Sequence, residues 1–307
     1  MAIRLPIVPP LRAYIRYFPF TFLKQALWDS VITHVVWLES DVTIKTVFGA
    51  KLSVDAHDAL GRNLYYFGVW EPNLTRWIQR RLRQGDTFID IGANIGYFSL
   101  LACGLVGDSG KVVSVEALPQ IFQRLEANLK TNGVCNTRAI NAAAWHREEK
   151  LKLFTQAEHP SGTTTLMHEW ADRFHLIDEV EVSAKPLSLM LTNDEIKNAR
   201  LIKIDVEGAE WNVISEMRSW LPCCRKDLEV IIEITCSMLK THGKRGQDVF
   251  DIFSDLGFKA YQIENDYRTS AYINHSNRHS PKRLDRFPIS EVDQYDIIFS
   301  RTDAPSL

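Results

Sequence analysis

An apolar strand that runs directly into a glycine turn and then a helix, over residues 88–99, constrains this chain more than any other feature. Its residues are Phe-Ile-Asp-Ile-Gly-Ala-Asn-Ile-Gly-Tyr-Phe-Ser. Gly92 and Gly96 allow a tight turn and let bare backbone approach a bound group, while Asp90 places a carboxylate at the carboxyl end of the strand. The segment therefore predicts an α/β fold with a ligand at the carboxyl edge of its sheet.

Short apolar runs alternate with helical segments from residue 87 onward, which is typical of a parallel sheet covered by helices on both faces. This pattern predicts the fold class: α/β, with a Rossmann-like sheet of seven strands. The strands are expected at residues 87–91, 111–115, 137–141, 201–205, 228–234, 258–263 and 295–300. Helices are expected at residues 95–105, 118–131, 187–198, 208–219 and 247–256.

The first part of the chain differs in texture, because Pro-rich and aromatic-rich pieces surround a predicted hairpin, 42–48 against 51–54, and a helix that starts at Pro72. We therefore predict an appendage at residues 1–84, which could pair subunits into a homodimer or cap the substrate. The main domain is then residues 85–307, with insertions at 145–185 and 264–292. Loops this long in a compact domain are usually functional or disordered.

Composition excludes several classes of protein. With 45% hydrophobic and 24% charged residues the chain is globular, and 36 basic against 38 acidic side chains give no general field for nucleic acid. The sequence predicts no membrane span and no secretory signal peptide. Its five cysteines lack zinc-type spacing, so free thiols and a cytoplasmic location are expected.

The order of glycines narrows the ligand. Dinucleotide enzymes need a third glycine where this chain has Ile95, so a nicotinamide cofactor is disfavoured. Glu116 ends the second strand, 20 residues beyond Gly96, where such folds place an acid that binds ribose hydroxyls. A nucleoside with a cationic tail, S-adenosylmethionine, fits these features. The alternative is that Gly92 and Gly96 only permit strand–helix packing and that Glu116 is a solvated strand end.

Several separated pieces carry a family resemblance: Phe67-Gly68-Val69-Trp70-Glu71-Pro72, the segment 85–100, Val115-Glu116-Ala117-Leu118-Pro119, Asn141-Ala142-Ala143 and Leu201-Ile202-Lys203-Ile204-Asp205-Val206-Glu207-Gly208-Ala209-Glu210. Through them the chain, over about residues 65–260, resembles the FkbM family of class I S-adenosylmethionine-dependent methyltransferases. The resemblance implies a seven-stranded sheet with a reversed last strand and methyl transfer, usually to a hydroxyl of a sugar or small biosynthetic product. Lys185-Pro186-Leu187-Ser188 departs from the Thr-Leu-Asp that is typical of relatives.

Cofactor contacts are predicted along the carboxyl edge of the sheet. Asn141 and Ala142 leave space for an adenine ring and an amide to read its edge, and Glu71 could reach the methionine amino group, as the resemblance suggests. Its alternative role is that of an acid at a helix start. The full predicted set is Glu71, Asp90, Gly92, Asn94, Gly96, Tyr97, Phe98, Glu116, Ala117, Asn141, Ala142 and Asp205.

Methyl transfer to an alcohol needs a group that takes the hydroxyl proton, and Asp205, at the end of a strand beside the Asp90 strand, is our first choice. Glu207 is the next candidate, although it could instead stabilise the start of the following helix. His159, in the 145–185 insertion, is a third candidate for the base. Glu233 interrupts an apolar strand and, with Asp205 and Glu207, could form an oxygen-rich site for Mg²⁺, but the spacing specifies no metal.

The sequence therefore predicts an O-methyltransferase that acts on a hydroxyl of a sugar or secondary-metabolite scaffold. Its partner would be a small-molecule acceptor: a sugar, a polyketide or a peptide product. Two alternatives stay open: N-methylation of an amide or amine in a peptide, and a catalytically silent module that binds the nucleoside or a partner protein.

Overall fold

The computed structural model describes residues 8–18, 23–28, 41–155, 171, 178–273, 280–288 and 292–307 of the 307-residue chain. The helices of these residues are α1 (Val8–Tyr17), α2 (Lys24–Leu27), α3 (Ala59–Phe67), α4 (Pro72–Arg81), α5 (Tyr97–Val106), α6 (Pro119–Thr131), α8 (Leu187–Met190), α9 (Asn193–Asn198), α10 (Glu210–Met217), α11 (Cys236–Thr241), α12 (Gly246–Asp255) and α13 (Thr269–Ile273). The strands are β1 (Val42–Lys45), β2 (Lys51–Val54), β3 (Thr87–Ile91), β4 (Lys111–Glu116), β5 (Thr137–Asn141), β6 (Ala143–Ala144), β7 (Glu149–Thr155), β8 (Asp178–Lys185), β9 (Ala199–Ile204), β10 (Glu229–Thr235), β11 (Lys259–Ile263), β12 (Lys282–Leu284) and β13 (Gln294–Ser300).

The main sheet has the order β12-β11-β13-β10-β9-β3-β4-β5. The central pairs are parallel, and β13 runs antiparallel to both β10 and β11, so the predicted α/β sheet and its reversed last strand are confirmed. The prediction of seven strands is wrong by one, because β12 forms within the 264–292 segment and pairs with β11. A three-residue edge strand that carries Lys282 and Arg283 has no apolar run from which it could be predicted.

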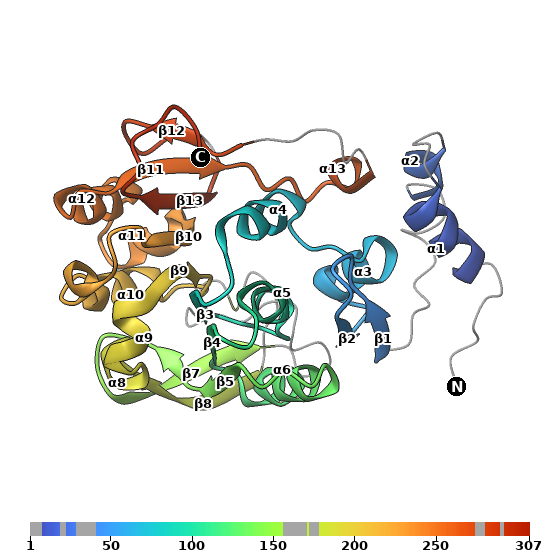
Figure 1. Ribbon diagram of the computed structural model, residues 1–307, viewed down its shortest axis with the longest axis horizontal. Coiled ribbons are helices and arrows are strands. Elements are labelled where there is room, and N and C mark those ends of the chain that lie inside the picture. The colour runs from blue at the N-terminus through green and yellow to red at the C-terminus, as the bar shows by residue number, and fades with distance from the viewer. Residues whose placement is uncertain are drawn as a thin grey trace.

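Helices cover both faces of this sheet, as Figure 1 shows with α4, α5 and α6 on one side and α10 and α12 on the other. Side chains alternate between the two layers along each strand, as the pleat requires. Ile202 packs in one core with α10 and α12, while its neighbour Leu201 packs in the other core with α4, α5 and α6. Both faces of the central strands are therefore apolar, up to the carboxyl edge.

The N-terminal elements pack against the main domain. The predicted hairpin is β1 and β2, and Pro72 begins α4 as expected. Helix α3, which was not predicted, shares a core with α5. Helices α1 and α2 pack on α3 and α13 through side chains that include Leu11, Trp28 and Tyr272 (Figure 1). The division at residue 84 stays a prediction.

The insertion at 145–185 holds strands that the sequence did not predict. β7 pairs antiparallel with β8, and β6 joins β8 on the other side. The exposed side chains of these strands are charged and pair across the ladder, as Lys152 does diagonally with Glu179 at 2.8 Å, so the sequence lacks the apolar pattern of a buried strand. His159, one of our predicted catalytic residues, lies outside the described residues.

The single helix expected at 187–198 is two helices, α8 and α9. Thr192 caps α9 and forms a reciprocal capping box with Glu195, so the chain must leave α8 before this point. At the start of α8, the backbone N–H of Ser188 donates to a carboxylate oxygen of Glu216 on α10 at 3.2 Å. The carboxylate at this turn therefore comes from another helix.

Candidate active site

A cavity of about 230 Å³ opens at the carboxyl edge of the main sheet, where β3 and β9 lie side by side. The chain leaves β3 toward β4 and β5 on one side, and leaves β9 toward β10 on the other. This reversal of strand order opens a crevice in which α/β proteins bind their ligands. Backbone of the turn after β3, the N-terminal ends of α4 and α5, and the ends of β9 and β10 line the cavity.

The glycine turn after β3 is built for close packing. Gly92 and Gly96 have φ of 80° and 92°, where a side chain is strained, and Asn94 adopts a φ of 49°. A Cβ on Gly92 would overlap the carbonyl oxygen of Asp205, and one on Gly96 would overlap Leu125. Packing therefore requires both glycines, as in the alternative interpretation that they only permit the strand to pack against the helix. Gly92 and Asn94 also line the cavity, so their predicted contact with a ligand stays open.

Asp90 lies beneath the cavity and not in its lining. Its side chain is 1% exposed, and its Oδ2 accepts a hydrogen bond from Ser99 Oγ at 2.6 Å, which in turn accepts one from Ser114 at 2.8 Å. Burial raises the pKa of this carboxyl. In this structure Asp90 does not open into the crevice, because the start of α5 covers the strand end, and its predicted contact with the cofactor stays a prediction.

Glu116 connects the glycine turn to the end of β4 through hydrogen bonds. Its carboxylate accepts hydrogen bonds from the backbone N–H groups of Asn94 and Leu118, each at 2.9 Å, so it is not a solvated strand end. Burial raises its pKa to about 7, and these two hydrogen bonds oppose that shift. Asn141 donates to the backbone carbonyls of Glu116 and Ala117, which aligns the ends of β4 and β5.

Ala142, in contrast, is buried in the core beside β3 and β9. Glu116, Ala117, Asn141 and Ala142 all lie outside the cavity lining, so their predicted roles toward the adenosine stay predictions.

Acidic side chains dominate the cavity. Glu71, Asp205, Glu207 and Glu233 all line it, and Glu71 is only 3% exposed. Burial, together with the charge of Asp205, raises the pKa of Glu207 to about 8 and that of Glu233 well above its ordinary value. Burial and the nearby Asp296 likewise raise the pKa of Glu71 to about 8. A cationic ligand would relieve this repulsion.

Lys203 is the feature of the site that the sequence analysis missed. It is 3% exposed, its Nζ donates to Asp205 Oδ2 at 2.6 Å, and it lies 4.9 Å from the centre of the Phe98 ring. The surrounding carboxylates raise its pKa, although burial opposes this, so the ammonium stays charged. A lysine inside the apolar run 201–204 was the signal that could have identified it.

Aromatic rings also line the cavity, next to the charged side chains. Trp70, Tyr97, Phe98 and Tyr267 line the cavity, and Tyr267 Oη donates to Glu71 Oε1 at 3.0 Å. The Trp70 and Tyr267 rings lie 5.5 Å apart. Tyr267 belongs to the 264–292 insertion, so this segment contributes directly to the site, through a residue that the sequence analysis did not single out.

The predicted group of Asp205, Glu207 and Glu233 is not the one that the structure brings together. Among the described residues, Glu71, Asp205 and Glu233 each offer a carboxylate oxygen, and these oxygens all lie within 4.8 Å of one another. Glu71 replaces Glu207 because α4 places its N-cap over the end of the sheet. Since the Lys203 ammonium already balances Asp205, we assign no metal to this set.

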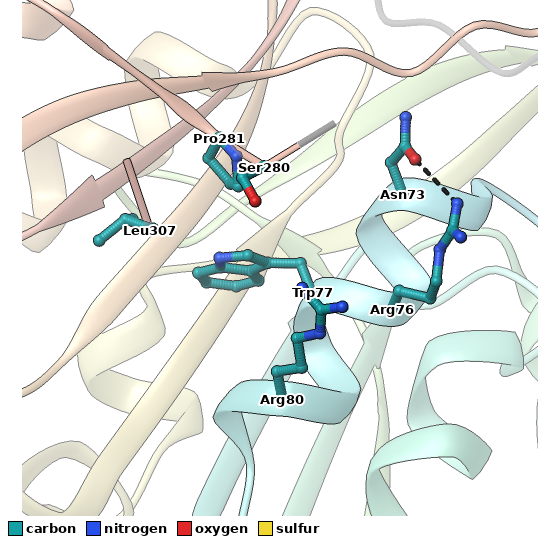
Figure 2. A pocket seen from close by; sticks show the side chains of 7 residues that line it. All are labelled: Asn73, Arg76, Trp77, Arg80, Ser280, Pro281 and Leu307. Carbon is teal, nitrogen blue, oxygen red and sulfur yellow. Dashed lines mark hydrogen bonds between the residues drawn. The ribbon is translucent and has the colours of Figure 1, made fainter. Parts of the chain in front are cut away.

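A second cavity, of about 20 Å³, lies between α4, which contributes Trp77, and the segments that carry Pro281 and Leu307 (Figure 2). Arg76 donates to Asn73 Oδ1 at 3.1 Å along its rim. This volume holds about one water molecule. We therefore place the functional site in the larger cavity, to which α4 contributes Glu71.

A membrane span is not among the features of this fold: within the described residues, the helices are too short or too polar to cross a bilayer.

Comparison with known proteins identifies relatives of the main domain. The family model described as "Methyltransferase FkbM domain" matches residues 90–260. The chain is 29% identical over 123 residues to protein-L-isoaspartate O-methyltransferase 2 of Archaeoglobus fulgidus, a match that covers 39% of this chain and 56% of that protein. It is 27% identical over 144 residues to methyltransferase 1 of Beauveria bassiana, covering 42% and 57%. The chain thus spans little more than half the length of these two relatives.

Solved structures with a similar fold include the methyltransferase FkbM from Methylobacillus flagellatus. It is 11% identical with a TM-score of 0.41, and the match covers 77% of this chain and 52% of that one. A SAM-dependent O-methyltransferase from Thermotoga maritima is 14% identical with a TM-score of 0.41, and the match covers 86% and 78%.

Proposed function

Because this chain belongs to the FkbM methyltransferase family, we propose that it transfers a methyl group from S-adenosylmethionine to a hydroxyl of a sugar or secondary-metabolite scaffold. The observation that supports this most is the acidic cavity at the point where the strand order reverses, three of whose acids, Asp205, Glu207 and Glu233, lie within the residues that the family model matches. The donor carries a sulfonium and an ammonium group, so a pocket rich in carboxylates suits it. The acceptor would be a small molecule.

The residues that line the cavity suit the cofactor. Glu71, Asp205 and Glu233 line the cavity and offer carboxylates to the sulfonium charge. Glu116, whose two oxygens accept from backbone N–H groups, lies outside the lining, so its contact with the ribose hydroxyls stays a prediction, as does that of Glu71 with the amino group. Gly92 and Asn94, in the glycine turn, also line the cavity. When bound, S-adenosylmethionine supplies a methyl carbon that an oxygen nucleophile can displace from sulfur in line.

The acceptor hydroxyl must lose its proton, and two carboxylates of the cavity can receive it. Asp205 is our first choice, with Lys203 holding one of its oxygens and leaving the other for the hydroxyl. Burial raises the pKa of Glu207 to about 8, and the residue is half-buried, so it can exchange a proton at neutral pH. Lys203 fixes the orientation of Asp205 and thereby the position of the bound proton.

A carboxyl acceptor is the second candidate, since the Archaeoglobus fulgidus relative is named a protein-L-isoaspartate O-methyltransferase. The cavity argues against it. A substrate carboxylate would lie among Glu71, Asp205, Glu207 and Glu233, with Lys203 already paired to Asp205. Like charges at such short range cost several kcal/mol at an effective dielectric constant of about 20. A neutral hydroxyl carries no such penalty.

Methyl transfer itself tests the proposal. The protein would be incubated with S-adenosylmethionine that carries a deuterated methyl group and with panels of polyols, hydroxylated polyketides and peptides, and the labelled atom located by mass spectrometry. Label on a hydroxyl oxygen is expected, whereas label confined to nitrogen or to a carboxylate would refute the hydroxyl acceptor. S-Adenosylhomocysteine at ~100 times its dissociation constant should stabilise the fold by about 2.7 kcal/mol, and the absence of any stabilisation would refute cofactor binding.

Asp205→Asn tests the base. We expect a loss of turnover of about 10²- to 10⁴-fold, with the affinity for S-adenosylhomocysteine within about threefold of the parent protein. Asp108→Asn, which changes an exposed aspartate on the turn after α5, is the matched control and should leave both quantities unchanged. Full turnover in Asp205→Asn would assign the proton to another group.

A further inference from the structure

Three carboxylates line the cavity close together, with a single paired ammonium group beside them. Oxygens of Glu71, Asp205 and Glu233 lie within 4.8 Å of one another. Lys203 donates to Asp205, while Glu71 accepts its hydrogen bond from the neutral Tyr267 hydroxyl. Within the described part of the chain, the Glu233 side chain has no hydrogen-bond partner, and its surroundings act on it through burial and charge alone. Glu71 and Glu233 are therefore left without a bonded cation.

The elements packed around these two side chains add further negative charge. Asp296 on β13 is the direct cross-strand neighbour of Glu233, and Asp90 on β3 is in register with Lys203. Glu207 and Glu210 follow β9, and both have a pKa raised to about 8 by burial and by Asp205. Carboxylates this close cannot all be ionised at once, so the set retains protons at neutral pH.

We propose that Glu71 and Glu233 select the positively charged methyl donor over its neutral product, by releasing a bound proton when the donor enters. The inference rests on the proposed function, because it requires S-adenosylmethionine in this cavity. The donor and S-adenosylhomocysteine differ by one methyl group and one positive charge on sulfur. A positive charge within ~4 to 6 Å favours the ionised form of a carboxyl, and by linkage the ionised carboxyls favour the cation to the same extent.

The proton balance of methyl transfer is consistent with the release of a proton when the donor binds. The acceptor hydroxyl loses one proton as its oxygen bonds to the methyl carbon and the carbon–sulfur electron pair goes to sulfur. The carboxylate set takes this proton at the moment when the sulfonium charge disappears. One proton thus leaves to solvent when the donor binds, one returns from the acceptor, and the net reaction releases one proton. The re-protonated set no longer attracts the neutral product, which favours its release.

Titration calorimetry of the full chain at about pH 7, in buffers with different ionisation enthalpies, tests the proposal without an acceptor. The dependence of the measured enthalpy on the buffer gives the number of protons exchanged. We expect about one proton released with S-adenosylmethionine and close to none with S-adenosylhomocysteine. The ratio of the two affinities should rise by up to tenfold per pH unit from about pH 6 to 8, in favour of the donor, and level off above about pH 9.

The variants Glu71→Gln and Glu233→Gln localise the effect. Each should weaken S-adenosylmethionine about tenfold at pH 8, change S-adenosylhomocysteine by less than about threefold, and reduce the released protons. Glu126→Gln, at an exposed position of α6, is the control and should match the parent.

Equal proton release by the two ligands, with parallel affinities across the pH range, would overturn the proposal even if the variants failed to fold. If the parent protein binds both ligands in this parallel way, cofactor binding survives and only the charge selection is refuted. If it binds neither ligand, the proposed function is refuted and the charge selection with it.

Discussion

Glu71→Gln should stabilise the protein, and by an amount that depends on pH. The carboxyl of Glu71 is 3% exposed, and burial with the charge of Asp296 raises its pKa from 4.5 to about 8. Between these pH values the folded state holds a proton that the unfolded state has released. Stability therefore falls as the pH rises through this window, and the full loss is present above about pH 8.

The size of the effect follows from the same two values. Each pH unit in the window is worth about 1.4 kcal/mol, so Glu71 costs about 3 kcal/mol at pH 7 and almost nothing below pH 4. Glutamine keeps the carbonyl oxygen that accepts from Tyr267 and carries no charge. We expect Glu71→Gln to unfold at higher urea concentration than the parent at pH 7, with the two proteins equal near pH 4.

Urea unfolding of both proteins at pH 4, 5.5, 7 and 8.5, followed by tryptophan fluorescence, measures this difference. Glu126→Gln, an exposed change of the same chemical type, should follow the parent at every pH. A gain that does not vary with pH would show that packing and not charge is responsible. A Glu71→Gln protein less stable than its parent at pH 8.5 would refute the reasoning.

Two further substitutions test other parts of the site. Gly92→Ala should destabilise the protein by more than ~3 kcal/mol, because φ is 80° and a Cβ would overlap the Asp205 carbonyl. Gly133→Ala, at φ 62° with open space around it, is the control and should cost only about 1 kcal/mol. Equal losses of unfolding free energy in urea would contradict the packing argument. Lys203→Met should cost about 3 to 5 kcal/mol at pH 8 by leaving Asp205 unpaired, and much less at pH 5, where neighbouring carboxyls take up protons. Identical losses of unfolding free energy at the two pH values would show that the lysine acts through packing alone.

The sheet could be predicted because its signal is local. Strands such as β3 and β10 are buried on both faces, so they are continuous apolar runs, and the glycine turn after β3 fixes where the first one ends. Strands β7, β8 and β12 were missed for the opposite reason. They lie at edges or in a separate small sheet, and their charged residues pair across strands.

The site could be predicted only in part, because its members come from distant parts of the chain. The ends of neighbouring parallel strands predicted Asp205 and Glu116, and the resemblance suggested Glu71. No rule of spacing placed Glu71 within 4.8 Å of Glu233, since this depends on how α4 docks over the sheet. Tyr267 was beyond prediction for the same reason: it reaches the cavity from a long insertion whose sequence has no periodic pattern.

A row of charged side chains across the sheet lowers the stability of the fold and at the same time favours a cationic ligand. Asp90, Lys203, Glu233 and Asp296 sit at the edge of four adjacent strands that are otherwise apolar, where hydrophobic residues of similar volume would give a more stable core. Their mutual repulsion is greatest in the empty pocket, so a ligand with positive charge removes more free-energy cost here than in a neutral cavity. A destabilised empty site is therefore the physical source of the preference for a cation, and a variant that relieves the repulsion should gain stability and lose that preference together.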